Sequence, residues 1–172
     1  AFVGSDPFAI LLGDTVTTSD SKPVTAQLCA AYETTGAPVV ALETVPEEKV
    51  SRYGVVGGKE ESHDLYRVSE FVEKPSPEKA PSNLVVASRY VFTPEIFSYL
   101  KKTPRGKGGE IQITDAMKLM LADHPMYGWR INGRRHDIGN KLEFVKSTVE
   151  FALKREDLHD DLIEFLKDLV EK

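Results

Sequence analysis

Two kinds of apolar pattern divide this chain into predicted strands and helices. Continuous apolar runs, the pattern of strands covered on both faces, predict strands over residues 8–12, 38–45, 84–92 and 126–131. Between the first two runs, apolar residues recur at helical spacing from Pro23 to Thr35, and Gly36 follows as a stop signal. The order strand, helix, strand predicts a crossover between parallel strands.

The middle of the chain has the pattern of a hairpin, with strands over 53–58 and 66–72 and a charged turn over 59–64. Residues 75–82 contain three prolines and are expected to form a loop. Helices are predicted from Pro94 to Lys101 or Lys102, from Thr114 onward, over 141–155, and over 158–170 in a carboxyl-terminal helical segment, 155–172. The whole pattern predicts an α/β fold with a mixed, mostly parallel sheet flanked by helices.

Composition narrows the class of protein. With 172 residues, of which 41% are hydrophobic, the chain is expected to form a single soluble domain. A formal net charge of -5 argues against a general nucleic-acid binder, and no apolar run approaches the ~18–20 residues that a membrane-spanning helix needs. Cys29 is the single cysteine, so we expect no disulfide framework, a core position for this residue, and a reducing cytoplasm as the location.

The start of the sequence suggests a truncated domain. It begins with Ala1, and residues 8–12 already have the pattern of a strand buried on both faces. Such strands usually lie in the middle of α/β sheets. We therefore expect that an amino-terminal segment of the domain is missing.

Two candidate sites follow predicted strands. Asp14 comes just after the first strand, where ligands bind in open α/β sheets and where a carboxylate can hold Mg²⁺ beside a phosphate; a solvated turn is the alternative. Glu73, Lys74 and Pro75 end the hairpin. There a carboxylate can accept sugar hydroxyls and an ammonium can bind a phosphate, and an exposed ion pair of little energetic value is the alternative.

Two further constellations lie later in the chain. Residues 106–110 are rich in glycine but do not match a phosphate-binding loop, and a surface loop before a helix cap at Thr114 is the better interpretation. In the segment His136 to Asn140, Asp137 could be a second metal carboxylate, or it or Asn140 could cap the following helix. His136 could act as a base, although a structural or solvated histidine is the more common outcome.

The motifs become specific in combination. In order, the sequence contains Leu-Gly-Asp (12–14), Tyr-Gly-Val-Val (53–56), Glu-Lys-Pro (73–75), Ser-Arg-Tyr-Val-Phe-Thr-Pro-Glu-Ile-Phe (88–97), Gly-Gly-Glu-Ile-Gln-Ile-Thr-Asp-Ala (108–116) and His-Asp-Ile-Gly-Asn-Lys (136–141). From about residue 7 to about residue 155 this series resembles the bacterial and archaeal UTP–glucose-1-phosphate uridylyltransferases of the sugar-nucleotidyltransferase superfamily. The resemblance implies a Rossmann-like nucleotidyltransferase fold, of which this chain would be the carboxyl-terminal part. A thymidylyl- or cytidylyl-transferring relative is the nearest alternative.

The resemblance also implies a reaction and a set of roles. Glucose 1-phosphate would attack the α-phosphorus of UTP, giving UDP-glucose and pyrophosphate, with Mg²⁺ neutralising phosphate charge. Asp14 and Asp137 would hold the metal, and Lys74 would hold the sugar phosphate. The sugar side would be formed by the remaining residues, namely Glu73, Gly54, Val86 through its main chain, and Glu110. Asp14 and Lys74 are thereby the candidate catalytic residues.

Two departures from the family pattern shape the expectations. Many relatives carry a second Asp where this chain has Thr15, and the family's first strand and glycine-rich loop, which bind the UTP triphosphate, have no counterpart here. We therefore expect this chain alone not to turn over, and we expect a homodimer, because residues 8–12 would present an unpaired apolar edge. The competing interpretations are a non-catalytic sugar-phosphate or nucleotide-sugar binding module and a structural domain whose carboxylates are surface groups.

Overall fold

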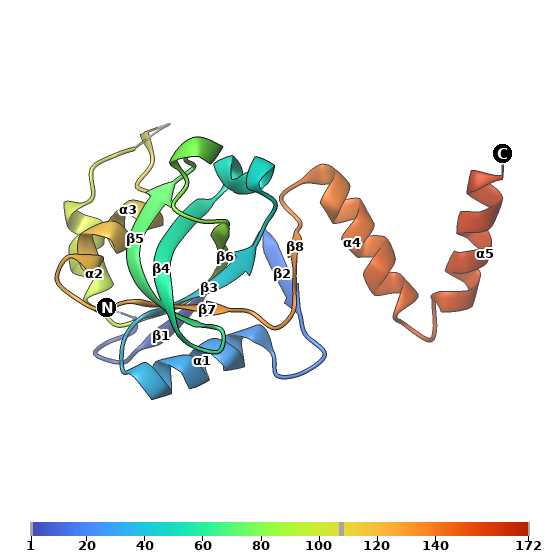
Figure 1. The fold of residues 1–172 in the computed structure, drawn as a ribbon. Helices are drawn as coiled ribbons and strands as arrows, with labels where there is room; N and C mark the ends of the chain where they lie inside the picture. Colours follow the sequence, from blue (N-terminus) through green and yellow to red (C-terminus); the bar gives the residue numbers. More distant parts are fainter. Residues whose placement is uncertain (1, 107–108, 172) are drawn as a thin grey trace. The chain divides into compact units, whose positions relative to one another are not determined.

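The computed structural model describes residues 2–106 and 109–171. These divide into two compact units (Figure 1): unit 1 contains residues up to 12 and residues 17–134, and unit 2 contains residues 13–16 and those from 135 onward. Each unit is described by itself below. The expectation of a single domain stays a prediction.

The strands are β1 (Phe8–Leu11), β2 (Thr15–Thr18), β3 (Val39–Thr44), β4 (Gly54–Ser62), β5 (Leu65–Glu73), β6 (Leu84–Phe92), β7 (Tyr127–Arg130) and β8 (Arg134–Asp137). The α-helices are α1 (Val24–Thr35), α2 (Ile96–Lys102), α3 (Ile113–Leu121), α4 (Lys141–Leu153) and α5 (His159–Val170). Short 3-10 helices cover η1 (Glu47–Arg52) and η2 (Pro77–Lys79). No helix among the described residues is long and apolar enough to cross a membrane.

The large sheet of unit 1 has the strand order β1-β6-β3-β7-β5-β4, and β4 also pairs with β6. The prediction of a mixed sheet is confirmed, but the prediction that it is mostly parallel is wrong. Only the β3–β7 pair is parallel, whereas β1–β6, β3–β6, β4–β5, β4–β6 and β5–β7 are antiparallel. The crossover does leave β1 and β3 pointing the same way, because both are antiparallel to β6. Apolar periodicity identified the strands, but it carries no information that β6 inserts between them.

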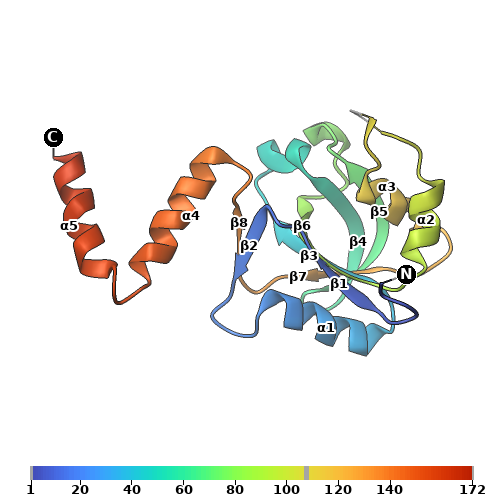
Figure 2. The ribbon, with the colours of Figure 1, turned by 180° about the vertical axis from the view of Figure 1, so that it is seen from behind.

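Helices cover both faces of this sheet, as Figures 1 and 2 show. Alternate residues of β3 divide between two cores, because successive side chains of a strand point to opposite faces. Val39 and Ala41 pack with α1 residues, including Leu28. Val40 and Leu42 pack on the other face with residues of α2 and α3. The four continuous apolar positions of β3 are fully buried, as the sequence predicts.

Two predictions of burial are wrong. Cys29 is exposed. The buried face of α1 is formed by Val24, Gln27, Leu28 and Ala31, and at about 100° per residue Cys29 falls on the opposite side of Leu28 from the other three. β1 is only half covered: Phe8 and Ile10 pack against the core, whereas Ala9 and Leu11 are exposed. β1 is the terminal strand of the sheet and pairs with β6. Self-association through this edge stays a prediction.

The strand pair β2 and β8, which forms a two-stranded sheet, was absent from the sequence prediction. Both strands consist mainly of polar or charged residues, Thr-Val-Thr-Thr and Arg-Arg-His-Asp, so neither has the apolar signal of a strand. In unit 2, the helices α4 and α5 agree closely with the predicted ranges. Their many exposed large apolar side chains include Leu142, Phe144, Phe165 and Leu169.

Candidate functional site

A pocket of about 340 Å³ in unit 1 brings together three of the candidate residues that the sequence proposes, Glu73, Lys74 and Glu110. It is lined by Glu73, Lys74, Glu110, Gln112 and Asp115. Glu73 is the last residue of β5, and the other side of the pocket is formed by the loop that leads into α3 and by its first turn. Residues more than 35 positions apart are thus brought together by the packing of α3 against β5.

The charges of this pocket suit a sugar phosphate. Among the residues that the structure describes, three carboxylates, on Glu73, Glu110 and Asp115, share it with one ammonium, on Lys74. The ammonium Nζ lies 3.7 Å from Oε1 of Glu73. Carboxylates only accept hydrogen bonds and therefore suit sugar hydroxyls, whereas an ammonium suits a phosphate. The arrangement can hold a polar ligand with hydroxyls at one end and an anionic group at the Lys74 end.

Gly54 stands directly opposite Glu73 in the β4–β5 ladder. A Cβ at this position would lie 3.0 Å from Oγ1 of Thr114 and 3.2 Å from Oε2 of Glu73. Such approaches are shorter than ordinary van der Waals contact, so the glycine lets these two side chains close over the backbone. Gly54 thus lies beside Glu73, and its proposed contact with a sugar stays a prediction.

Lys74 has an unusual backbone conformation. Its φ is +44°, in the left-handed region that non-glycine residues seldom adopt, and it precedes Pro75, which disfavours helical conformations of the residue before it. Its backbone N–H donates to the carbonyl of Tyr53 at 3.0 Å, which anchors this conformation. Strained residues of this kind gather at functional sites, so the geometry agrees with a binding role for Lys74.

Of the two remaining sugar-side candidates, Glu110 lines the pocket and Val86 does not. Glu110 lines the pocket, is exposed, and accepts a hydrogen bond from Nε2 of Gln112 at 3.4 Å. Val86 is not among the lining residues; its side chain is buried in the core with Leu42 and Tyr90. Its proposed main-chain contact stays a prediction. Within the glycine-rich segment, Lys107 and Gly108 lie outside the described residues.

The two candidate metal carboxylates come together in unit 2, although 123 positions separate them in the sequence. They meet beside Gly139: a Cβ there would lie 3.4 Å from Oδ1 of Asp137 and 3.7 Å from Oδ2 of Asp14. The Gly139 N–H donates to the Asp14 carbonyl at 3.1 Å, which ties the two segments together. Two carboxylates on the same side of Gly139 are a donor set that fits Mg²⁺, which takes one or two protein carboxylates and completes its shell with water or phosphate.

The remaining residues of this segment have structural roles. Asn140 caps α4: its Oδ1 accepts hydrogen bonds from the backbone N–H groups of Leu142 and Glu143. His136 is buried, with Nδ1 3.2 Å from Oγ of Ser147 and its ring packed on Phe151. Asn140, and not Asp137, is therefore the helix cap, which leaves the Asp137 carboxylate for another role.

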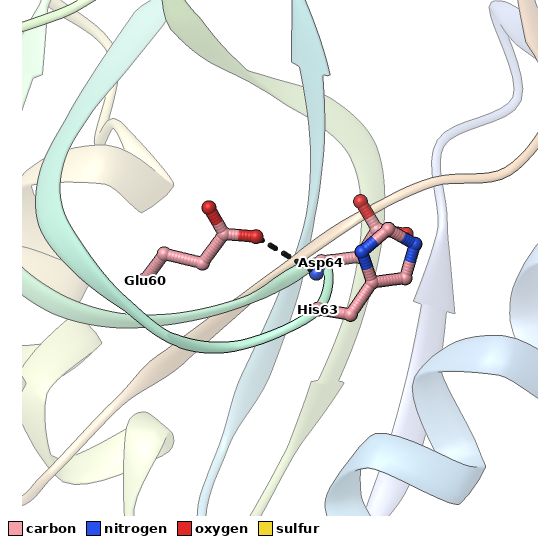
Figure 3. Close-up of side chains that lie close together, drawn as sticks. All are labelled: Glu60, His63 and Asp64. Atoms are coloured by element: carbon pink, nitrogen blue, oxygen red, sulfur yellow. Dashed lines mark hydrogen bonds and ion pairs between the residues drawn. The ribbon is translucent and has the colours of Figure 1, made fainter.

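A second cluster of possible metal ligands, Glu60, His63 and Asp64, lies at the β4–β5 turn (Figure 3). Its carboxylates are already in use within the fold. Oδ1 of Asp64 accepts hydrogen bonds from Nε and Nη2 of Arg130, both at 2.7 Å, and this bonding raises the pKa of Arg130 above its ordinary value. Oε1 of Glu60 accepts the Asp64 backbone N–H at 3.1 Å. These contacts fasten the hairpin turn to β7.

Sequence reasoning missed two residues that line the pocket, Gln112 and Asp115, and the position of the Thr114 side chain beside Gly54. Thr114 was interpreted only as a helix cap, but the cap position belongs to Gln112, which makes no side-chain capping hydrogen bond. The signal that was available is the motif Gln-Ile-Thr-Asp itself, whose polar residues interrupt the apolar face of α3. A pattern of this kind does not show which strand end the helix will pack against.

Comparisons with known proteins show the family of this chain. A family model described as nucleotidyl transferase matches residues 1–153. The chain is 46% identical over 168 residues to a UTP–glucose-1-phosphate uridylyltransferase of Staphylococcus haemolyticus and 47% identical to one of Staphylococcus saprophyticus. In each case 98% of this chain is covered but only 58% of the relative's length.

Solved structures give the same result. A UDP-glucose pyrophosphorylase crystallised with UDP-glucose matches with a TM-score of 0.86 at 37% identity, covering 90% of this chain and 59% of that chain. A UTP-bound UGPase from Acinetobacter baumannii matches with a TM-score of 0.85 at 31% identity, covering 99% of this chain and 58% of that one. With the family model matching most of its length, and with relatives that share both sequence and fold, this chain belongs to the nucleotidyl transferase family.

Proposed function

We propose that this chain carries the sugar-phosphate part of a UTP–glucose-1-phosphate uridylyltransferase. The observation that carries the proposal is the pocket in which the Glu73 carboxylate and the Lys74 ammonium stand side by side next to Gly54. Glu73 accepts hydroxyls of the glucose ring, and Lys74 binds the phosphate on its anomeric carbon. The relatives with this name, and a structural neighbour complexed with UDP-glucose, support this choice of ligand.

In the proposed reaction, a phosphate oxygen of glucose 1-phosphate attacks the α-phosphorus of UTP. A new P–O bond forms, the bond to the β-phosphate oxygen breaks, and pyrophosphate leaves. Catalysis of such transfers consists mainly of positioning and neutralisation of charge. Lys74 supplies both to the attacking phosphate, because its charge draws the anion to the end of the sugar pocket and lowers the repulsion as two anionic groups approach.

Mg²⁺ is the proposed cofactor, and Asp14 and Asp137 are its proposed ligands. When bound, the ion would supply positive charge to phosphate oxygens. The two carboxylates flanking Gly139 form the donor set for this role, since hard divalent cations prefer oxygen ligands. Thr15 donates to Oδ1 of Asp14 at 3.4 Å, so it helps to hold this carboxylate in place.

Several expectations from the sequence remain proposals. We propose a cytoplasmic location, where UTP and sugar phosphates are made and used, and a homodimer joined through the β1 edge. We also propose that these 172 residues alone do not complete the reaction, because the chain spans 58% of the length of the curated relatives it matches. Detection of UDP-glucose formation by this chain alone would contradict the last point.

The test is calorimetric titration with UDP-glucose, with and without Mg²⁺, on the wild-type chain and on Glu73→Ala. Hydrogen bonds to a charged group contribute about 1.5–3 kcal/mol each, so the variant is expected to bind at least about tenfold more weakly. Glu48→Ala, which removes an exposed carboxylate on η1, is the control and is expected to bind like the wild type. Equal binding by Glu73→Ala and the wild type would contradict the proposal.

A further inference from the structure

Helix α4 has a row of apolar side chains on the face that points away from its support. The row consists of Leu142, Val145, Val149 and Ala152. Spacings of three, four and three residues place these side chains on one side of the helix. Ser147 lies on the opposite side, where it is buried beside His136. The row itself is open: Leu142 is 61% exposed and Val145 is 57% exposed.

Helix α5 has a second row of the same kind. It consists of Leu158, Leu162, Phe165 and Leu169, at spacings of four, three and four residues. Within α5, all of whose residues the structure describes, none is buried. Phe165 is 58% exposed and Leu169 is 60% exposed. Alternating spacings of three and four residues are the pattern of helices that pack side by side along an apolar seam.

The two rows of one chain do not cover each other. A short connection, residues 154–158, joins α4 to α5, yet Leu142 and Val145 on α4 and Phe165 and Leu169 on α5 each keep more than half of their surface exposed. Contiguous apolar surface that stays exposed to water is the usual mark of a protein–protein contact, because covering it is favourable. Another molecule is therefore the expected cover for both rows.

Charges beside the rows indicate which surface fits which. On α4, Lys141 and Lys146 stand next to Leu142 and Val145 of the row, and on α5, Asp161 and Asp168 stand next to Leu162 and Leu169. All four charged side chains are exposed. Lys146 contacts Glu143 at 3.0 Å on its own helix, an exposed pair that is easily exchanged for another.

These charges favour unlike helices as neighbours. Packing α4 on a second α4 would set lysine against lysine, and packing α5 on a second α5 would set aspartate against aspartate. Charges that flank an apolar seam select the partner in this way. Packing α4 of one molecule on α5 of another places opposite charges together, and a second copy of this chain supplies both helices.

We propose that two copies of this chain associate through these helices, with α4 of each copy packed on α5 of the other. The contact then occurs twice about a two-fold axis, which closes the assembly as a dimer. This interface is formed by α4 and α5 alone and is separate from the β1 edge. It goes beyond the proposed function, because neither the sugar pocket nor the metal carboxylates take part in it.

The experiment measures the dimer dissociation constant of the full chain by sedimentation equilibrium. We expect Phe165→Glu to raise this constant at least about tenfold, because the new carboxylate would be buried in the apolar seam. Val170→Glu is the matched control: Val170 is 83% exposed on the same helix but lies outside the row, so this variant should associate like the wild type. Leu11→Glu, at an exposed position of β1, should also leave this association intact. Circular dichroism checks that each variant is folded.

Charge reversal tests the pairing of unlike helices. Replacing both lysines, by Lys141→Glu and Lys146→Glu, should weaken association, and so should Asp161→Lys with Asp168→Lys. Combining all four substitutions in one chain should recover most of the affinity, because opposite charges then face each other again. Pairing of like helices predicts no such recovery, so a combined variant that associates more weakly than either pair would overturn the inference.

Two further results would also overturn it. One is a wild-type chain that stays monomeric at every concentration measured. The other is association that Leu11→Glu abolishes and Phe165→Glu leaves unchanged, which would assign the contact to the β1 edge. No substrate is present in these measurements, so either result leaves the proposed function intact.

Discussion

Lys74, the proposed phosphate-binding residue, has a left-handed backbone conformation. We therefore expect this lysine to lower the free energy of unfolding of the chain. A non-glycine residue in this region costs about 1–2 kcal/mol, and the following proline adds to the restriction. The contact of its Nζ with Glu73, at 3.7 Å and half exposed, returns only about 0–1 kcal/mol. The native lysine therefore stores strain that a glycine would release.

The perturbation is the pair Lys74→Gly and Lys74→Ala. Both remove the ammonium, and both should bind UDP-glucose much more weakly than the wild type. They differ in backbone freedom, because alanine keeps the strain and glycine removes it. We expect Lys74→Gly to be more stable than Lys74→Ala by about 1 kcal/mol, the net of the strain released and the chain entropy that glycine loses on folding.

The assay is urea unfolding followed by circular dichroism, with the free energy of unfolding compared at equal slopes. Lys79 gives a matched control, because it is an exposed lysine in η2 whose φ is not positive. At this position the order should reverse, with Lys79→Ala the more stable by about 0.5–1 kcal/mol. The reasoning is refuted if Lys74→Ala is as stable as Lys74→Gly, or if both positions show the same order.

Three further predictions concern the two sites and the surface. Gly54→Ala should weaken UDP-glucose binding at least about tenfold while the chain stays folded by circular dichroism, because the new Cβ would push Thr114 and Glu73 apart; unchanged affinity would contradict this. Asp14→Asn and Asp137→Asn should each abolish the increase in UDP-glucose affinity that Mg²⁺ gives, and addition of a chelator to the wild type should reproduce their affinity; a Mg²⁺ effect that survives both substitutions would exclude this site. Cys29 is exposed on α1, so one thiol per chain should react with a disulfide reagent without denaturant, and a thiol that reacts only after unfolding would contradict its placement.

The sequence predicted the elements of this fold better than their pairing. The nine residues of β6 coincide with the predicted run 84–92, and Gly36 ends α1 in the left-handed conformation that a stop signal implies. The insertion of β6 between β1 and β3 could not be predicted, since strand order depends on contacts between distant segments. The strands β2 and β8 were missed because they lack an apolar signal. Few of their side chains are buried, so polar residues are tolerated there.

For the candidate site, too, the sequence predicted individual residues better than the contacts between them. Asp14 and Asp137 were possible metal carboxylates from their positions after predicted strands, and the resemblance to a family implied them as a pair. The structure places both beside Gly139. The pairing of Glu73 with Gly54 follows from the hairpin register, which the sequence indicated only loosely. The position of Thr114 beside Gly54 and the positive φ of Lys74 depend on how α3 and the end of β5 pack together, and single-sequence patterns do not report such contacts.

The central claim, that this chain binds the sugar-phosphate end of the substrates, is tested most directly by comparing two halves of UDP-glucose. Glucose 1-phosphate and UMP are each titrated into the wild-type chain in the presence of Mg²⁺, with the dissociation constant of each measured by calorimetry. The account predicts that glucose 1-phosphate binds at least about tenfold more tightly than UMP, because Glu73, Lys74 and Glu110 all line the proposed sugar-phosphate pocket. Tighter binding of UMP, with no measurable affinity for glucose 1-phosphate, would contradict it.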